Sequence, residues 1–189
     1  MRKTMELLEL VKKDPHTMSI PNLLSLSRLL LLPFICYAIT LNSSAGNITA
    51  LILMILSGLT DFFDGYLARH LDQRSHLGRI LDPLLDKISV AVLMLFLAAY
   101  RPLPYWYAGL VIGRDLLILV AAVSLVNRVK IVVESNFLGK CTLVSFLVVI
   151  VLYILNWHPM NLVSLWISTL LVPLTLISYF KRFRNMVTQ

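Results

Sequence analysis

The stretch "DFFDGYLARHLDQRSHLGRILDPLLD", residues 61–86, places four aspartates in the middle of a very hydrophobic chain. Asp61 and Asp64 are three residues apart and Asp82 and Asp86 are four apart, so each pair shares one face of a helix. The centre of the stretch, at residues 73–74, lies midway between the two pairs. In an antiparallel helical hairpin the two pairs would therefore come level and converge on one cavity. A carboxylate at membrane depth costs about 2.5–3.5 kcal/mol on insertion scales, so the arrangement needs a physical reason.

The four aspartates are the expected ligands of a metal site. Close carboxylates repel one another unless a positive charge lies among them. Oxygen-only ligands select hard cations such as Mg²⁺, Mn²⁺ or Ca²⁺ over zinc. Two divalent cations would match four carboxylates, and paired metal ions suit phosphoryl-group chemistry. The residues alone therefore predict two hard divalent cations, Mg²⁺, Mn²⁺ or Ca²⁺, held by Asp61, Asp64, Asp82 and Asp86.

Small residues and one cation accompany these acids. Gly65 and Ala68 lie on or beside the acidic face of the first helix, and Gly78 opens the second. Small side chains let a ligand approach the backbone, although they also simply let helices pack closely. Arg69 adds a fixed cation that suits a phosphate. Beside four level aspartates, the ligand-binding interpretation is the stronger one.

The composition is that of a polytopic membrane protein. The 189 residues are 58% hydrophobic and 14% charged, and the mean hydropathy is +0.81. The formal net charge is +7; with so apolar a chain this charge indicates a negatively charged membrane surface rather than a nucleic-acid partner. Cys36 and Cys141 lie inside apolar runs and are expected to be free thiols.

The apolar segments predict an all-α integral membrane protein with six transmembrane helices. Each segment approaches the roughly 20 residues that a spanning helix needs. Residues 1–17 predict an amphipathic helix on the membrane surface, with a frayed tail as the alternative. Residues 18–189 would form a single six-helix catalytic domain. The predicted spans are Ile20–Leu41, Ile48–Arg69, Leu77–Tyr100, Pro104–Val126, Asn136–Leu155 and Asn161–Phe180.

Loop charges predict the orientation. Basic residues such as Lys12, Lys13, Arg74 and Lys130 fall on the face that carries the N-terminus, whereas the opposite face carries only Arg101. Cytoplasmic loops collect Lys and Arg. We therefore expect both termini in the cytoplasm, an active site that faces the cytoplasm, and residence in a bacterial inner membrane.

The opening stretch reads D-x2-D-G-x2-A-R-x8-G-x3-D-x3-D without a departure. In this it resembles the signature of the CDP-alcohol phosphotransferase family, also called the class I CDP-alcohol phosphatidyltransferases. The resemblance extends to the six spans, the N-terminal surface helix and a first span that begins "IPNLLSLSR". It covers nearly the whole chain.

The resemblance implies a reaction and a role for each motif residue. A CDP-lipid such as CDP-diacylglycerol would donate its phosphatidyl group to an alcohol acceptor, and CMP would leave. The resemblance implies that the four aspartates hold two metal ions, Mg²⁺ or Mn²⁺, and that Asp86 also acts as the general base. Dimerisation is usual in the family, so the resemblance also implies a homodimer. The residues expected to bind the CDP moiety are Asp61, Gly65, Ala68, Arg69 and Gly78.

The acceptor is predicted from residues outside the motif. Arg114 lies inside a span, where a charged residue is a functional-site hypothesis by default, although an internal pair with Asp115 is the alternative. Arg114 with Lys140 would bind an anionic acceptor, and the patterns around them look most like phosphatidylglycerophosphate synthases, which use glycerol 3-phosphate. Those enzymes commonly carry a second arginine where this chain has Ala122, a departure that Arg128 and Lys130, in the expected cytoplasmic loop, would compensate.

Three alternatives stay open at this point. "GRDLLILVAAV", residues 113–123, also resembles the cardiolipin synthases of the same family, which use phosphatidylglycerol as acceptor. Arg28, two turns into the first span, would either touch a lipid phosphate or pair with an acid. A small cation transporter or a scaffold protein is the different-class alternative, but the acids cluster near one face, and neither repeated halves nor broken helices are seen.

Overall fold

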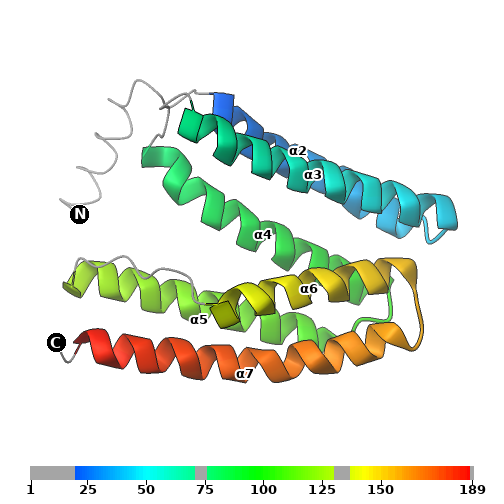
Figure 1. Cartoon of the computed structure of the whole chain (residues 1–189). Helices are drawn as coiled ribbons and strands as arrows, with labels where there is room; N and C mark the ends of the chain where they lie inside the picture. The colour runs from blue at the N-terminus through cyan, green and yellow to red at the C-terminus, as the bar shows by residue number, and fades with distance from the viewer. Residues whose placement is uncertain (1–19, 71–75, 130–136, 188–189) are drawn as a thin grey trace. The chain divides into compact units, whose positions relative to one another are not determined.

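The chain is helical wherever its structure is described. The computed structural model describes residues 20–70, 76–129 and 137–187, and within them the side chains of residues 27–60, 63, 84–121, 137–181 and 184. These ranges hold six helices (Figure 1), so the six predicted helical segments are confirmed as helices, whereas the predicted helix over residues 1–17 lies outside the described residues. The helices are α2 (Ile20–Thr40), α3 (Ser44–His70), α4 (His76–Tyr100), α5 (Tyr105–Val129), α6 (Phe137–Leu155) and α7 (Met160–Val187).

Some helix ends differ from the bounds that were predicted from the apolar runs. α3 begins four residues before the predicted span, because the Ser43 hydroxyl accepts a hydrogen bond from the Gly46 amide at 3.1 Å and so caps the helix. α7 continues beyond the predicted span, through several basic residues, to Val187. The apolar run indicates only how much of the helix fits within lipid, and the helix itself can extend further. His70 ends α3 and His76 begins α4.

The helices form two compact units, residues 1–92 and 93–189, with the division inside α4. In the first unit α2 and α3 run side by side (Figure 1). Their close approach depends on Gly46: a Cβ added there would lie 2.7 Å from the backbone oxygen of Ala38. Ala50, one turn further along α3, is fully buried. Small residues spaced one turn apart are the usual means by which membrane helices approach closely.

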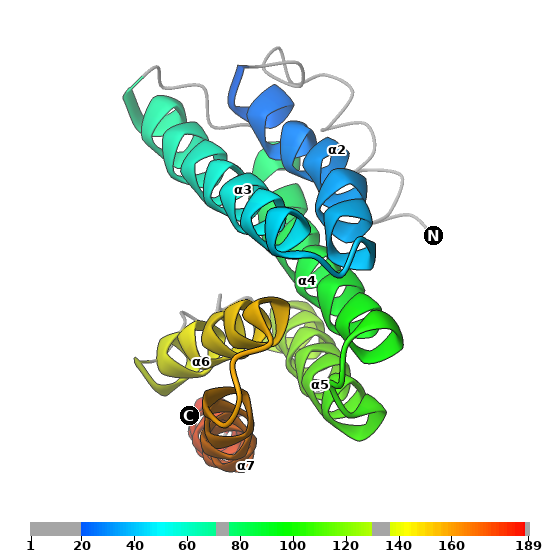
Figure 2. The same ribbon diagram turned by 90° about the vertical axis from the view of Figure 1, so that its right-hand side faces the viewer.

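In the second unit α7 packs against both α5 and α6, and Figure 2 shows α6 and α7 side by side. The buried residues of α6 recur every three or four positions, which is the period of one helix face. They are Gly139, Thr142, Phe146, Val149, Ile150, Tyr153 and Ile154.

The outer faces of these helices are also apolar. On α6 the exposed positions include Leu143, Val144, Leu147 and Val148. A helix that is apolar all round is either buried or surrounded by lipid. Two of the described helical stretches, Phe137–Leu155 and Met160–Lys181, are long and apolar enough to cross a membrane, and two shorter apolar stretches are Ser27–Thr40 and Ser44–Thr60. The observed surface therefore agrees with a membrane environment.

Candidate active site

The four aspartates of the opening stretch all lie on helices of the first unit. Asp61 and Asp64 are in α3, and Asp82 and Asp86 are in α4. Helical backbone at these positions confirms that each pair shares a helix face. The side chains of the first three lie outside the described residues, so the convergence of all four remains a prediction. Among the side chains that are described, no group of three or more His, Cys, Asp and Glu gathers around a possible metal ion.

The motif residues expected to bind CDP are likewise placed only by their backbone. Gly65, Ala68 and Arg69 are in the last two turns of α3, and Gly78 is in the first turn of α4. Their side chains lie outside the described residues. Their predicted role therefore depends on the motif alone.

Asp86, the predicted general base, forms an ion pair with Arg28 of α2. The Nη1 atom of Arg28 donates to Oδ1 of Asp86 at 2.6 Å across 58 residues of sequence. The Arg28 side chain is 7% exposed, whereas that of Asp86 is 56% exposed. Of the two interpretations of Arg28, the structure contains the pairing with an acid. Contact with a lipid phosphate stays a prediction.

Arg114 and Asp115 form a buried pair in α5 of the second unit. Nη1 of Arg114 donates to Oδ1 of Asp115 at 2.5 Å, and both residues are less than a tenth exposed. The Arg114 guanidinium carbon lies 5.7 Å from the centroid of the Phe146 ring, a cation–π arrangement with α6. Nε of Arg114 is buried and lacks a hydrogen-bond partner in the described part of the chain. The predicted internal ion pair is therefore present.

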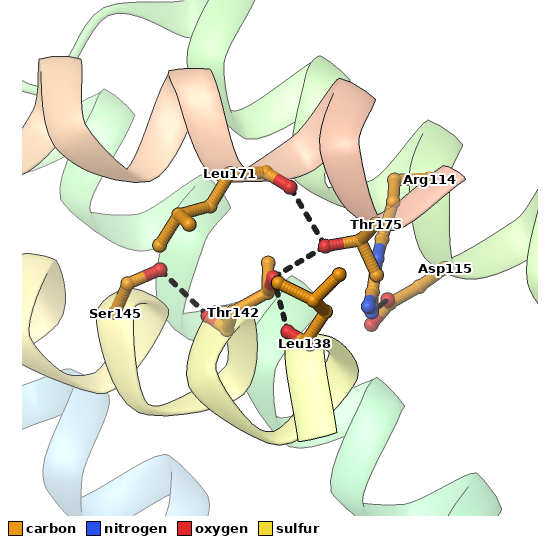
Figure 3. A network of polar contacts seen from close by, with 7 residues as sticks. All are labelled: Arg114, Asp115, Leu138, Thr142, Ser145, Leu171 and Thr175. Atoms are coloured by element: carbon orange, nitrogen blue, oxygen red, sulfur yellow. Dashed lines mark hydrogen bonds and ion pairs between the residues drawn. The ribbon is translucent and has the colours of Figure 1, made fainter. Parts of the chain in front are cut away.

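A network of hydroxyl groups joins α6 to α7 near this pair, as Figure 3 shows. The hydroxyl oxygens of Thr142 and Thr175 are 2.6 Å apart and fully buried. Each hydroxyl also lies within hydrogen-bond distance of a carbonyl in its own helix, at Leu138 and Leu171 respectively. One of the two hydroxyl protons therefore lies between the two oxygens, and the other hydroxyl donates to the carbonyl of its own helix.

A second set of polar contacts joins α5, α6 and α7. The Tyr107 hydroxyl of α5 lies 2.7 Å from the Ser168 hydroxyl of α7, which in turn lies 3.0 Å from the Ser145 hydroxyl of α6. Tyr107 is two helical turns before Arg114, on the same side of α5. These bonds and the Phe146 ring were not expected from the sequence. The available signal was the spacing of Thr142, Ser145, Ser168 and Thr175, which recur at helical intervals on otherwise apolar helices.

The structure shows less about the other residues that were predicted to bind the acceptor substrate. Lys140 is exposed on the first turn of α6, and no ion pair involves it among the described side chains. Arg128 and Ala122 lie in the last two turns of α5, with side chains outside the described residues. Cys36 and Cys141 are both free, as expected.

One further buried cation, Arg101, follows α4 and is 7% exposed. Burial lowers the pKa of its guanidinium from the ordinary value, because the charged form loses hydration. It was not assigned a role from the sequence, and it lies outside the helices that carry the aspartates.

Comparison with known proteins matches the chain to one family. Residues 18–177 match the model of the family described as CDP-alcohol phosphatidyltransferase. The chain is 36% identical over 157 residues to the CDP-diacylglycerol–glycerol-3-phosphate 3-phosphatidyltransferase of Aquifex aeolicus, an alignment that covers 81% of this chain and 85% of that protein. It is 28% identical over 171 residues to the protein of the same name from Rickettsia bellii, covering 86% and 94% respectively.

A relative with a different name is also similar. The cardiolipin synthase (CMP-forming) of Streptomyces coelicolor is 34% identical over 128 residues, which cover 66% of this chain and 60% of that protein. The family match spans the aspartate stretch and most of the helices described above. The chain therefore belongs to the CDP-alcohol phosphatidyltransferase family, whose members are membrane-bound transferases of phospholipid biosynthesis.

Proposed function

We propose that this protein transfers the phosphatidyl group of CDP-diacylglycerol to glycerol 3-phosphate, forming phosphatidylglycerol phosphate and releasing CMP. The observation that carries the proposal is the 36% identity over 81% of the chain to the Aquifex aeolicus protein named for that reaction. The unbroken aspartate motif supports the same chemistry.

The donor groups available in the motif fit a pair of hard divalent cations. Asp61, Asp64, Asp82 and Asp86 offer only carboxylate oxygens, and both pairs lie on helices of one unit. Such ligands suit Mg²⁺ or Mn²⁺. When bound, the cations would neutralise the pyrophosphate of the donor and stabilise the leaving CMP. The motif residues Gly65, Ala68, Arg69 and Gly78 would hold the CDP moiety, with Asp61.

Asp86 would act as the general base. Its carboxylate takes the proton of the acceptor hydroxyl, the hydroxyl oxygen forms a bond to the phosphorus of the phosphatidyl group, and the bond from that phosphorus to CMP breaks. More than half of the Asp86 side chain is exposed, as a base that must reach an entering substrate requires. Its carboxylate accepts a hydrogen bond from Nη1 of Arg28 at 2.6 Å.

Arg114 would bind the phosphate of the acceptor. A buried guanidinium is costly, and its pair with Asp115 satisfies Nη1 but not Nε. An acceptor with a phosphate group supplies the missing acceptor atom and a compensating charge. Lys140 and Arg128 are the further candidates for this role. An uncharged alcohol such as inositol would supply no compensating negative charge to this guanidinium.

Cardiolipin synthesis from phosphatidylglycerol is the second candidate. Two observations favour it: the 34% identity to the Streptomyces coelicolor cardiolipin synthase, and Ala122 where phosphatidylglycerophosphate synthases commonly have a second arginine. Phosphatidylglycerol carries one phosphodiester charge, whereas the phosphate monoester of glycerol 3-phosphate carries up to two. The absence of that second arginine therefore fits phosphatidylglycerol as the acceptor better than glycerol 3-phosphate.

The proposed enzyme crosses the membrane six times, with both termini and the metal site at the cytoplasmic face of a bacterial inner membrane. The helical segments and the concentration of Lys and Arg in alternate loops support this topology. The single catalytic domain over residues 18–189 and the homodimer that the family resemblance implies are part of the same proposal.

The test is CMP release by the purified full-length chain in detergent. CDP-diacylglycerol and Mg²⁺ or Mn²⁺ are supplied, and acceptors are offered one at a time. We expect CMP with glycerol 3-phosphate, loss of turnover on chelation of the metal, and a decrease of about 100-fold or more in Asp86→Asn, the usual scale of general-base catalysis. Turnover only with phosphatidylglycerol would favour cardiolipin synthesis, and the absence of CMP with every acceptor would refute both.

A further inference from the structure

In the ion pair between Arg28 and Asp86, the arginine side chain is buried and the aspartate side chain is exposed. Arg28 of α2 is 6% exposed, with its Nη1 atom 2.6 Å from the Asp86 carboxylate. The Asp86 side chain is 56% exposed. A side chain enclosed by packing has few alternative rotamers, whereas an exposed carboxylate turns freely unless something holds it. The buried partner therefore sets the orientation of the exposed one.

The orientation of the Asp86 carboxylate matters for catalysis. A base must present its oxygen to the acceptor hydroxyl within hydrogen-bond distance, and a displacement of about 1 Å commonly costs about 100-fold in rate. Charge-assisted hydrogen bonds from a guanidinium are short and directional. Arg28 supplies one such bond from a different helix, 58 residues earlier in the chain.

We propose that Arg28 is the positioning residue of the general base: its guanidinium holds the Asp86 carboxylate in the orientation from which it takes the proton of the acceptor. This inference rests on the function proposed above, in which Asp86 is the base. It differs from a role in which Arg28 binds the phosphate of the lipid substrate. A lipid contact would act on the binding of the donor, whereas a positioning residue acts on the chemical step.

The kinetic test compares Arg28→Gln and Arg28→Lys with the wild-type enzyme. We expect Arg28→Gln to lower kcat by about 100-fold while the KM values for CDP-diacylglycerol and for the acceptor change by less than about 3-fold. Arg28→Lys keeps the charge and one donor, so it should recover part of kcat. Arg101→Gln is the matched control, because Arg101 is also a buried arginine with no place in the mechanism; it should retain wild-type kcat.

The decisive measurement is the double variant Arg28→Gln with Asp86→Asn. If Arg28 acts only through Asp86, the double variant is no slower than Asp86→Asn alone. A second readout needs neither substrate nor metal: in metal-free protein the two substitutions together should shift the thermal unfolding midpoint by less than the sum of their separate shifts. If Arg28→Gln does not fold, Arg28→Lys replaces it in both cycles.

The outcomes separate this inference from the proposed function. A raised KM for CDP-diacylglycerol with unchanged kcat in Arg28→Gln would overturn the positioning role and favour the lipid phosphate. Additive effects of the two substitutions on kcat or on the unfolding midpoint would overturn it as well. Full activity in Asp86→Asn, or absence of CMP release by the wild-type enzyme, would instead count against the proposed function itself.

Discussion

Substitution of Thr142 and Thr175 is the most direct test of how α6 is held against α7 near Arg114. The substitutions Thr142→Val and Thr175→Val keep the shape of each side chain and remove its hydroxyl. Each wild-type hydroxyl lies 2.6 Å from the other and within hydrogen-bond distance of a carbonyl of its own helix. When one threonine is replaced, the other therefore still has a partner, and no buried donor is left unsatisfied.

The expected magnitude follows from that redundancy. Hydrogen bonds between membrane helices contribute about 0.6 kcal/mol on average and about 1.7 kcal/mol at most. Because both threonines are fully buried and their contact is short, we expect a coupling free energy between about 0.6 and about 1.7 kcal/mol. This corresponds to a factor of about 3 to about 18 in the unfolding equilibrium constant. A larger penalty would require an orphaned hydroxyl, which the structure does not leave.

The assay is reversible unfolding in mixed detergent micelles for the wild-type enzyme, the two single variants and the double variant. Thr169→Val is the control, because Thr169 also lies on α7 and, within the described residues, its hydroxyl bonds the carbonyl of Leu165 and no residue of α6. It should show no coupling to Thr142→Val. A Thr142–Thr175 coupling below about 0.2 kcal/mol, or one no larger than that of the control pair, would refute the reasoning.

Substitutions at four further positions test the candidate site and the first unit. Arg114→Met should raise the KM for glycerol 3-phosphate by about 10-fold or more and leave the KM for CDP-diacylglycerol unchanged, with Arg114→Lys intermediate in steady-state kinetics. Phe146→Leu removes the ring beside that guanidinium and should weaken acceptor binding by about 0.5–2 kcal/mol, measured as the same KM. Asp82→Asn should weaken Mn²⁺ binding in electron paramagnetic resonance titrations, because it removes one carboxylate ligand. Gly46→Val should destabilise the α2–α3 pair by about 1–3 kcal/mol in detergent unfolding, since its Cβ would meet the Ala38 carbonyl.

Each of these expectations has a contradicting result. An unchanged acceptor KM in Arg114→Met would remove that residue from the acceptor site, and an equal effect on the donor KM in Phe146→Leu would indicate general damage. Unaltered Mn²⁺ binding in Asp82→Asn would exclude it as a ligand. Gly58, which has open space around it, provides the control for Gly46: Gly58→Val should leave stability nearly unchanged, and a loss equal to that of Gly46→Val would refute the close-approach argument.

The positions of the helices were predictable from the sequence. Apolar runs of nearly spanning length, separated by short polar turns, mark helices without reference to any partner. The predicted and observed starts of α2 coincide at Ile20, while α3 begins earlier at Ser44 because a local serine cap, not apolarity, decides where that helix starts. The aspartate spacing similarly determined which acids share a helix face, since that depends only on 3.6 residues per turn.

The partners of the charged residues were decided only by the tertiary structure. Spacing places Arg28 on one helix and Asp86 on another, but it does not determine that these two meet across 58 residues. The same holds for Arg114 and Phe146, which are brought together by the packing of α5, α6 and α7. Helical periodicity is a property of one segment, whereas the pairing of helices depends on how the small, polar and apolar groups of several segments fit together. The sequence by itself thus determined the helices, the acidic motif and the family chemistry, and the packing of the helices decided which side chain holds Asp86 and which ring lies beside Arg114.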